Sequence, residues 1–251
     1  MISLAKRITQ RLVVGTRFEA PVKRLHHGLT GSKNSLYDAL AIEIMRRVLR
    51  RDSNAIDVGA FEGGMLSHMT RLAPRGTHVA FEPLADRYER LVRAFPNVRS
   101  YPYAIGDSAG ETVFHRAVRH PALSGLKRRD LESSEGIQEE RVTMETLDRM
   151  IPGDQPVALV KIDVEGAELG VFRGGIQTLR RTRPIIIFEC GLGGADWFGV
   201  EPEQVHDCLT DTIGLRVSLL DRWLSGGVSL TREQFASQFR DRLNFFFLAH
   251  P

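Results

Sequence analysis

Short apolar runs alternate with amphipathic stretches from residue 53 to residue 250 of this chain. Runs of about four to eight apolar residues predict strands, and apolar positions three or four residues apart predict helices. The predicted strands are Ala55–Val58, Thr77–Phe81, Val98–Ile105, Val157–Ile162, Pro184–Phe188, Leu215–Leu220 and Phe245–Ala249. The predicted helices between them are Gly64–Leu72, Leu84–Ala94, Ala167–Arg173, Ile176–Arg180, Pro202–Thr210 and Thr231–Leu243, the last capped by Thr231.

This alternation predicts right-handed crossovers, with helices on both faces of one sheet. Most of the central strands are apolar at every position, which is typical of a parallel sheet covered on both faces. We therefore expect an α/β fold: a doubly wound, mostly parallel, seven-stranded Rossmann-like sheet, with an N-terminal helical extension and an inserted hairpin or loop.

Residues 1–52 are expected to form a basic helical extension, with a helix over Ser35–Leu49 whose N-cap is Ser35. Through residue 51 the chain carries eleven Lys and Arg against three Asp and Glu, so this part holds eight net positive charges and the rest five net negative ones. A solvated helix surface is the simplest explanation, and an anionic membrane, a nucleic acid or an acidic partner is the alternative. Residues 1–14 predict a short amphipathic helix that packs on the domain or lies on a membrane surface.

Residues 53–251 are expected to form the main domain, which an insertion over residues 106–146 interrupts. Thr112–Val118 and Arg141–Thr146 predict strands, and a polar, basic stretch joins them. A long connection of this kind is often functional. We expect a hairpin with a loop over the ligand crevice, whose His115 and His120 would suit an anionic acceptor if the loop takes part in binding.

Composition places the chain among soluble globular proteins, with 42% hydrophobic and 26% charged residues. Two cysteines, Cys190 and Cys208, make no disulfide framework and predict reduced thiols, with Cys190 in the core. No apolar run reaches the length of a membrane span, and the N-terminal stretch lacks the apolar segment of a signal peptide. The expected location is cytoplasmic, with peripheral membrane contact through the basic N-terminal helix left open.

The richest chemistry lies where the first predicted strand ends in Asp57 and runs into a glycine-rich turn, Gly59–Gly64. The second strand ends in Glu82, 25 residues after Asp57. An NAD site would show G-x-G-x-x-G, with bare amides facing a pyrophosphate, whereas this turn is spaced G-x-x-x-G-G and follows a carboxylate. Asp57 would repel a pyrophosphate, and Glu82 is placed to accept both hydroxyls of a ribose. S-adenosylmethionine, which has an ammonium, a sulfonium and a ribose but no phosphate, fits better than NAD.

Further motifs follow the same order and spacing as in a known family. They are Asp57-Val58-Gly59-Ala60 with Gly63, Phe81-Glu82-Pro83, Thr146-Leu147-Asp148, Lys161-Ile162-Asp163-Val164-Glu165-Gly166-Ala167-Glu168, Arg183-Pro184 and Phe188-Glu189. Over about residues 53–250 the chain resembles the FkbM-type methyltransferases. The family commonly has Asn where this chain has Phe61, and residues 1–50 lie outside the resemblance.

The resemblance implies a class I methyltransferase that uses S-adenosylmethionine to methylate a hydroxyl of a sugar, glycan or natural product. It places Asp57, Gly59, Ala60 and Gly63 along the methionine part of the cofactor and Glu82 on the ribose. It also places Ala104 and Ile105 near the adenine, through backbone groups. Asp107 is a turn residue in the simpler interpretation and an adenine contact in the other.

Asp163 and Glu189 are the candidate catalytic residues, because each ends a predicted strand near the expected position of the transferable methyl group. Asp163 would take the proton of the acceptor hydroxyl or orient that hydroxyl; alternatively it holds the cofactor amine or caps the next helix. Glu189 would bind substrate hydroxyls, or is only a polar residue at a strand exit. Glu165 and Glu168 are expected in the first turn of the next helix, stabilised by its dipole. A divalent metal on Asp163, Glu165 and Glu189 is the least favoured alternative, and no metal is predicted.

Three functions compete. The preferred one is an O-methyltransferase whose partner is a small-molecule or glycan hydroxyl acceptor. A nucleic-acid methyltransferase is weaker, because enzymes that methylate base amines usually have an Asp/Asn-Pro-Pro-aromatic run where this chain has Asp163-Val164-Glu165-Gly166. No specific nucleic-acid partner is therefore expected. A non-catalytic module that binds S-adenosylmethionine is the third, and the retained acids and glycines argue against it. The acceptor's identity and the oligomeric state stay open.

Overall fold

The computed structural model describes residues 33–120, 123–128 and 136–251. The amphipathic helix expected at residues 1–14, and the prediction that it contacts a membrane, lie outside this part of the chain. Among the described residues, no helix combines the length and the apolar character needed to cross a membrane.

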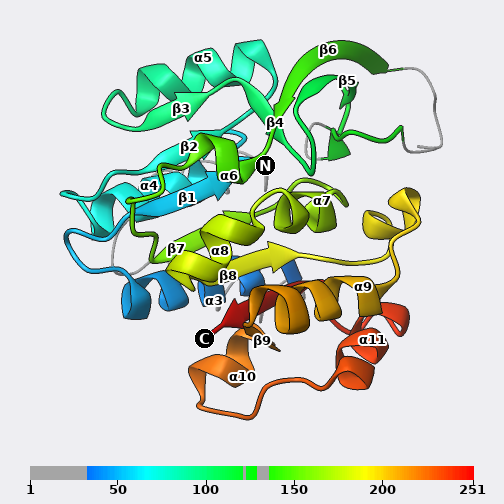
Figure 1. Ribbon diagram of the computed structural model, residues 1–251. Helices are drawn as coiled ribbons and strands as arrows, with labels where there is room; N and C mark the ends of the chain where they lie inside the picture. Colours follow the sequence, from blue (N-terminus) through cyan, green and yellow to red (C-terminus); the bar gives the residue numbers. More distant parts are fainter. Residues whose placement is uncertain (1–32, 121–122, 129–135) are drawn as a thin grey trace, which may run out of the picture.

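A seven-stranded sheet runs through the centre of the molecule (Figure 1). Its strands lie in the order β3-β2-β1-β7-β8-β10-β9. All neighbours are parallel except β10, which lies antiparallel between β8 and β9. The strand bounds are β1 Ala55–Val58, β2 Val79–Phe81, β3 Arg99–Tyr101, β7 Leu159–Ile162, β8 Ile185–Glu189, β9 Arg216–Ser218 and β10 Phe246–His250. The predicted fold class, an α/β fold with a mostly parallel Rossmann-like sheet, is confirmed.

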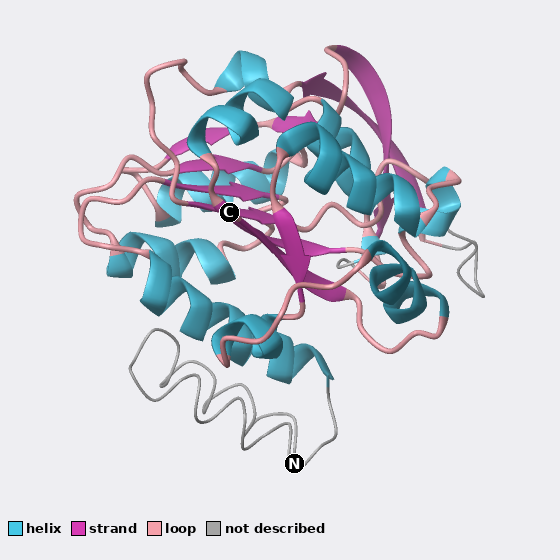
Figure 2. Cartoon of the chain, turned by 60° about the horizontal axis from the view of Figure 1, so that its bottom comes forward, coloured by secondary structure: helices cyan, strands magenta, loops and turns pink. Residues whose placement is uncertain are grey.

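Helices cover both faces of the sheet (Figure 2). One face packs against α3 Lys33–Val48, α4 Gly64–Leu72, α5 Ala85–Ala94 and α10 Leu220–Leu224. The other packs against α6 Leu147–Met150, α7 Glu168–Arg173, α8 Ile176–Thr182, α9 Pro202–Asp207, the π-helix η3 Cys208–Ile213 and α11 Arg232–Arg240. A 3-10 helix, η2 Ala195–Phe198, lies between β8 and α9. Because alternate residues of β1, β2, β7, β8 and β10 enter the two apolar clusters, both faces of the sheet are buried along these strands.

A second, three-stranded sheet contains the insertion. It has the order β4-β6-β5, from β4 Tyr103–Ile105, β5 Gly110–Ala117 and β6 Ile137–Glu145. The two strands predicted within the insertion are thus β5 and β6, and they pair as an antiparallel hairpin. The loop between them turns back onto β5, because Gly125 and His115 exchange backbone hydrogen bonds of 2.8 and 3.1 Å.

Three predictions about where strands and helices begin or end were wrong. The strand predicted over Val98–Ile105 is broken at Pro102, which has no N–H to continue a ladder, so its two halves join different sheets. The strand predicted over Leu215–Leu220 ends at Ser218, and α10 begins at Leu220. Ser35 lies inside α3, which begins at Lys33. The cap at Thr231 is confirmed, since its side chain accepts a hydrogen bond from the Gln234 N–H in a capping box.

Candidate functional site

Two cavities open at the carboxyl ends of β1, β2, β7 and β8. The larger, of about 790 Å³, lies between these strand ends, α3 and the segment before β10. The smaller, of about 180 Å³, lies between the strand ends and the insertion. Both are lined by Phe61, Lys161, Asp163 and Glu165, so they meet at these four residues. In doubly wound sheets ligands bind at this edge.

The turn after β1 is held close to β7. Gly59 has a φ of +77°, and a Cβ at this position would collide with the carbonyl oxygen of Asp163. The N–H groups of Gly59 and Ala60 both donate to the Phe81 carbonyl, at 3.1 and 3.0 Å, which fixes the turn to β2. Gly59 lines the smaller cavity and Ala60 the larger.

Gly63 lines neither cavity, although the sequence placed it beside the cofactor. It is the N-cap of α4 with a φ of +76°, and a Cβ there would collide with the Phe95 ring. The need for a glycine at position 63 is therefore explained by the turn and by the packing between α4 and the end of α5.

Glu82 lies at the tip of β2 with only 3% of its surface exposed. One carboxylate oxygen accepts the Phe61 N–H at 3.0 Å, and the other accepts the Leu84 N–H at 3.1 Å. Burial raises the pKa of this carboxyl, while the two backbone donors and the Arg87 guanidinium oppose the rise. Glu82 therefore holds both its own turn and the glycine turn, and it faces the smaller cavity.

Phe61, the position where the chain departs from the family pattern, has a φ of +50°. A bulky residue rarely adopts this conformation, whereas Asn tolerates it. The Arg87 guanidinium lies 4.4 Å from the centre of the Phe61 ring, within reach of a cation–π contact. That contact gives the phenyl ring a partner that compensates part of the backbone strain.

Ala104 and Ile105, at the end of β4, line the smaller cavity with Glu82. The insertion closes it with Phe114, Ser124 and Leu126. The described part of the inserted loop thus does lie over the crevice. Asp107 lines a separate cavity of about 620 Å³, together with His115 and Lys127.

Lys161 is the residue of this site that sequence reasoning missed. Its Nζ donates to the Gly59 carbonyl at 3.0 Å and lies 3.3 Å from Asp163 Oδ2 and 3.6 Å from Asp57 Oδ1. Burial alone would lower the pKa of this ammonium, but the Asp163 and Asp57 carboxylates outweigh burial and raise it. Lys161 could have been found from its spacing: it precedes Asp163 by two residues, so both side chains lie on the same face of β7.

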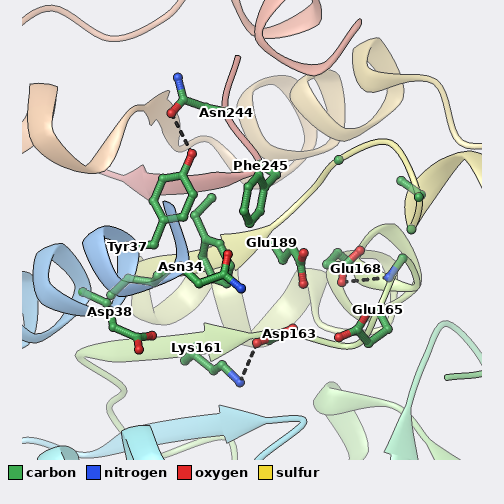
Figure 3. A pocket seen from close by; sticks show the side chains of 18 of the residues that line it. Asn34, Tyr37, Asp38, Lys161, Asp163, Glu165, Glu168, Glu189, Asn244 and Phe245 are labelled. Atoms are coloured by element: carbon green, nitrogen blue, oxygen red, sulfur yellow. Dashed lines mark hydrogen bonds and ion pairs between the residues drawn. The ribbon is translucent and has the colours of Figure 1, made fainter. Parts of the chain in front are cut away.

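Three carboxyl groups meet at the floor of the larger cavity (Figure 3). Oxygens of Asp163, Glu165 and Glu189 lie within 4.8 Å of one another. Burial, and then the neighbouring Asp163 carboxyl, raise the pKa of Glu189 well above its usual value. Such oxygens could hold a divalent cation, but the Lys161 ammonium already supplies a positive charge beside Asp163.

The two acids expected in the first turn of the following helix differ. Glu165 precedes α7 and lies in a turn with a φ of +59°, so its predicted place in the helix was wrong. Glu168 is the first residue of α7 and is 1% exposed. Its carboxylate accepts the N–H groups of Val164 and Gly166, both at 3.1 Å. Burial raises its pKa to about 7.

Another part of the lining of the larger cavity comes from segments that carry no sequence motif. The hydroxyl of Tyr37, on α3, donates to Asn244 Oδ1 at 2.8 Å. The Tyr37 and Phe245 rings pack edge to face, with their centroids 4.8 Å apart. Lys33 Nζ donates to the Leu243 carbonyl at 3.0 Å, which ties the start of α3 to the same segment. Figure 3 shows Tyr37 away from Asp163, and Phe245 beside Glu189, where the Cys190 N–H donates to the Phe245 carbonyl at 2.8 Å.

The strand order, the glycine turn after β1 and the acid at the tip of β2 together define a Rossmann-like methyltransferase fold. The family model described as the methyltransferase FkbM domain matches residues 57–212, and the chain belongs to this family of methyltransferases. No curated protein matches the sequence.

Several solved structures are similar to this chain at low sequence identity. Methyltransferase FkbM from Methylobacillus flagellatus is 12% identical with a TM-score of 0.51, over 91% of this chain and 53% of that one. The present chain thus spans about half the length of that protein. A geranyl diphosphate methyltransferase in complex with SAM is 13% identical with a TM-score of 0.45, over 88% of this chain and 90% of that one. An rRNA-methylase from Clostridium thermocellum, described as putative, is 11% identical with a TM-score of 0.44, over 83% and 90%.

Proposed function

We propose that this protein transfers a methyl group from S-adenosylmethionine to a hydroxyl of a sugar, a glycan or a natural product. The observation that carries the proposal is the junction of the two cavities. The smaller cavity has the buried Glu82 carboxylate and the larger has an aromatic wall, and the two meet at Asp163. A cofactor and an acceptor placed in adjoining cavities would meet at one carboxylate.

The residues of the smaller cavity fit a nucleoside. Each Glu82 oxygen accepts one backbone N–H, and a carboxylate oxygen accepts about two hydrogen bonds, so each retains capacity for a ribose hydroxyl. Ala104, Ile105 and Leu126 provide apolar surface for an adenine. Asp57 and Ala60 line the larger cavity and Gly59 lines the smaller one. These three residues would line the methionine part, where an acid suits an ammonium group. When bound, S-adenosylmethionine supplies a methyl group on a positive sulfur, and its transfer to a hydroxyl leaves a neutral thioether and a released proton.

Asp163 is the residue we assign to the acceptor hydroxyl. Its side chain is 28% exposed and opens to both cavities, while Lys161 fixes one of its oxygens. A carboxylate held in this way would accept the hydroxyl hydrogen and align the oxygen, and it would take the proton as the C–O bond forms. Glu189, which has a carboxyl oxygen within 4.8 Å of one of Asp163, would stabilise the orientation of that carboxylate or bind a second hydroxyl of the acceptor.

The larger cavity favours a neutral or cationic acceptor over an anionic one. Its lining includes Asp38, Asp57, Asp163, Glu165, Glu168 and Glu189 but only Lys161 and Arg242 as bases among the described residues. The basic residues His115 and Lys127 of the insertion line a different cavity. The anionic acceptor suggested by the insertion sequence is therefore disfavoured, and a nucleic acid, with its phosphates, is disfavoured for the same reason. A ring with several hydroxyls would lie against Tyr37 and Phe245.

Calorimetric titration of S-adenosylhomocysteine tests the cofactor assignment. We expect micromolar-range binding to the wild type, and Glu82→Ala should weaken it by about 1.5–3 kcal/mol, because hydrogen bonds to a charged group are lost. Glu89→Ala on the outer face of α5, where the side chain is 65% exposed, is the control. Equal affinity in wild type and Glu82→Ala would remove Glu82 from the ribose site. Asp163→Asn should retain S-adenosylhomocysteine binding and should lose turnover on an identified acceptor.

We also propose that the protein works in a reducing, cytoplasmic environment. Cys190 and Cys208 are both buried free thiols, which supports that location. Mass spectrometry of the purified protein under non-reducing conditions should find both thiols unmodified.

A further inference from the structure

We propose that Lys161 sets the charge of the reaction site, so that the site does not bind the positive sulfonium of the substrate cofactor more tightly than the neutral thioether of the product. This inference rests on the function proposed above. The observation behind it is the position of one buried ammonium among the carboxylates where the two cavities meet.

The position of Lys161 is fixed from three directions. Its hydrogen bond to the Gly59 carbonyl connects it to the turn after β1. Asp57, its register partner on β1, lies on one side, and Asp163 lies on the other. The Lys161 side chain is 10% exposed, so its charge acts where water screens it weakly. These contacts hold the ammonium between the two carboxylates.

Lys161 is also the single base, among the described residues, that lines both cavities. Arg87 lines only the smaller cavity and lies against the Phe61 ring, and Arg242 lines only the larger. Asp163 and Glu165 line both cavities. Without Lys161, the only ionisable groups among the residues that line both cavities would be the carboxyls of Asp163 and Glu165.

The consequence follows from how binding energy acts on catalysis. An interaction that stabilises the starting state more than the transition state slows the chemical step. Carboxylates beside a positive sulfur do this, because the charge is present before methyl transfer and lost after it. A fixed ammonium beside those carboxylates reduces their attraction for the sulfonium and leaves attraction for the uncharged product almost unaltered. Lys161 thus acts through Asp163 and Asp57 as a positioning residue.

Titration calorimetry with S-adenosylmethionine and S-adenosylhomocysteine tests this without an acceptor. The measured quantity is the ratio of the two dissociation constants in each variant of the full chain. Lys161→Met should shift the ratio toward S-adenosylmethionine by about tenfold, as expected for the loss of one weakly screened charge. Asp163→Asn should shift it in the opposite direction. Lys161→Arg keeps the charge and should keep the ratio within about twofold of wild type.

Opposite shifts in Lys161→Met and Asp163→Asn support the proposal, because a loosened fold would weaken both ligands together. Thermal unfolding of each variant identifies a folding defect, and if Lys161→Met does not fold, Asp163→Asn and Lys161→Arg still decide. An Asp163→Asn ratio equal to that of wild type, or a Lys161→Arg ratio shifted as strongly as expected for the methionine variant, overturns the charge assignment. If the wild type binds S-adenosylhomocysteine but no variant changes the ratio, this inference fails while the proposed function stands. A wild type that binds neither ligand refutes both.

Discussion

The carbonyl oxygen of Asp163 fills the space that a Cβ on Gly59 would need. The turn after β1 and the end of β7 are therefore in direct backbone contact, and the Lys161 ammonium bridges them a second time through the Gly59 carbonyl. Asp163 also donates its backbone N–H to the Val58 carbonyl at 3.1 Å, which continues the pairing of β1 and β7 up to the site. The candidate catalytic carboxylate and the candidate cofactor turn thus move as one unit.

Gly59→Ala should disrupt both the fold and cofactor binding. The substitution places a side chain on a left-handed residue, at about 1–3 kcal/mol, and forces β1 and β7 apart in addition. We expect the free energy of unfolding in urea to fall by at least about 2 kcal/mol, with S-adenosylhomocysteine binding weakened or lost. Gly64→Ala is the matched control, because a Cβ at Gly64 meets no atom within 4 Å and its φ is not positive. If the two alanine variants have equal stability, the close approach at Gly59 is not a constraint.

Glu168 should make stability depend on pH. The pKa of its carboxyl is about 7 in the folded protein, against an ordinary value of 4.5. Between these values the folded state keeps a proton that the unfolded chain has released, so raising the pH from about 4.5 to 7 lowers the free energy of unfolding. Glu168→Gln removes this loss. Its free energy of unfolding minus that of wild type should therefore rise with pH across this window, by up to on the order of 3 kcal/mol.

The measurement is urea unfolding of both proteins at several pH values from 4 to 8. Glu111→Gln, at a side chain that is 77% exposed, serves as the control. A Glu168→Gln difference that stays constant with pH would mean that the Glu168 carboxyl has the same pKa in the folded and the unfolded protein.

Tyr37→Phe should weaken binding of the acceptor and leave binding of the cofactor unchanged. The substitution removes the hydrogen bond to Asn244 and keeps the ring against Phe245, at a cost of about 0.5–1.5 kcal/mol in stability. Because Tyr37 lines only the larger cavity, S-adenosylhomocysteine should bind as in wild type, while KM for an identified acceptor should rise. A weakened cofactor affinity in calorimetry would instead place the methionine part of the cofactor against α3.

Leu126→Ala should show that the insertion is part of the cofactor pocket. Its side chain lines the smaller cavity and packs with Leu84, Ala104 and Phe114. Loss of this apolar surface should weaken S-adenosylhomocysteine binding by about 1–2 kcal/mol. Val118→Ala is the control, since Val118 belongs to the same insertion but is 48% exposed. Unchanged affinity in Leu126→Ala would mean that the adenosine lies elsewhere and that the insertion only covers the sheet.

Sequence reasoning reached the features that local pattern determines. The alternation of strands and helices is enough to predict the sheet, and the acids at strand ends are enough to predict that Asp57, Glu82, Asp163 and Glu189 lie at one edge. It failed at Pro102, where a single missing N–H redirects the chain into a second sheet. It also assigned Gly63 to a ligand, because a sequence does not show whether a glycine faces a cavity or a phenyl ring.

The remaining residues depend on contacts that no local pattern contains. Tyr37 and Asn244 are 207 positions apart and form a hydrogen bond only because α3 and the segment before β10 pack together. Lys161 lies within the most family-specific motif, but it is part of an otherwise apolar strand. Its role can be inferred only when the register that pairs Lys161 with Asp57 is known. The pKa of Glu168 depends on complete burial, which its position near a helix start does not imply.

The placement of β10 between β8 and β9 also affects the order in which the molecule can assemble. During synthesis β10 follows both β8 and β9 in the chain. The edges of β8 and β9 that pair with β10 therefore stay unpaired until β10 has been made. Asn244 and Phe245, which precede β10 and form the acceptor wall, arrive at the same late stage. The half of the site that we assign to the cofactor can therefore form during synthesis, whereas the half that we assign to the acceptor is completed only when β10 enters the sheet.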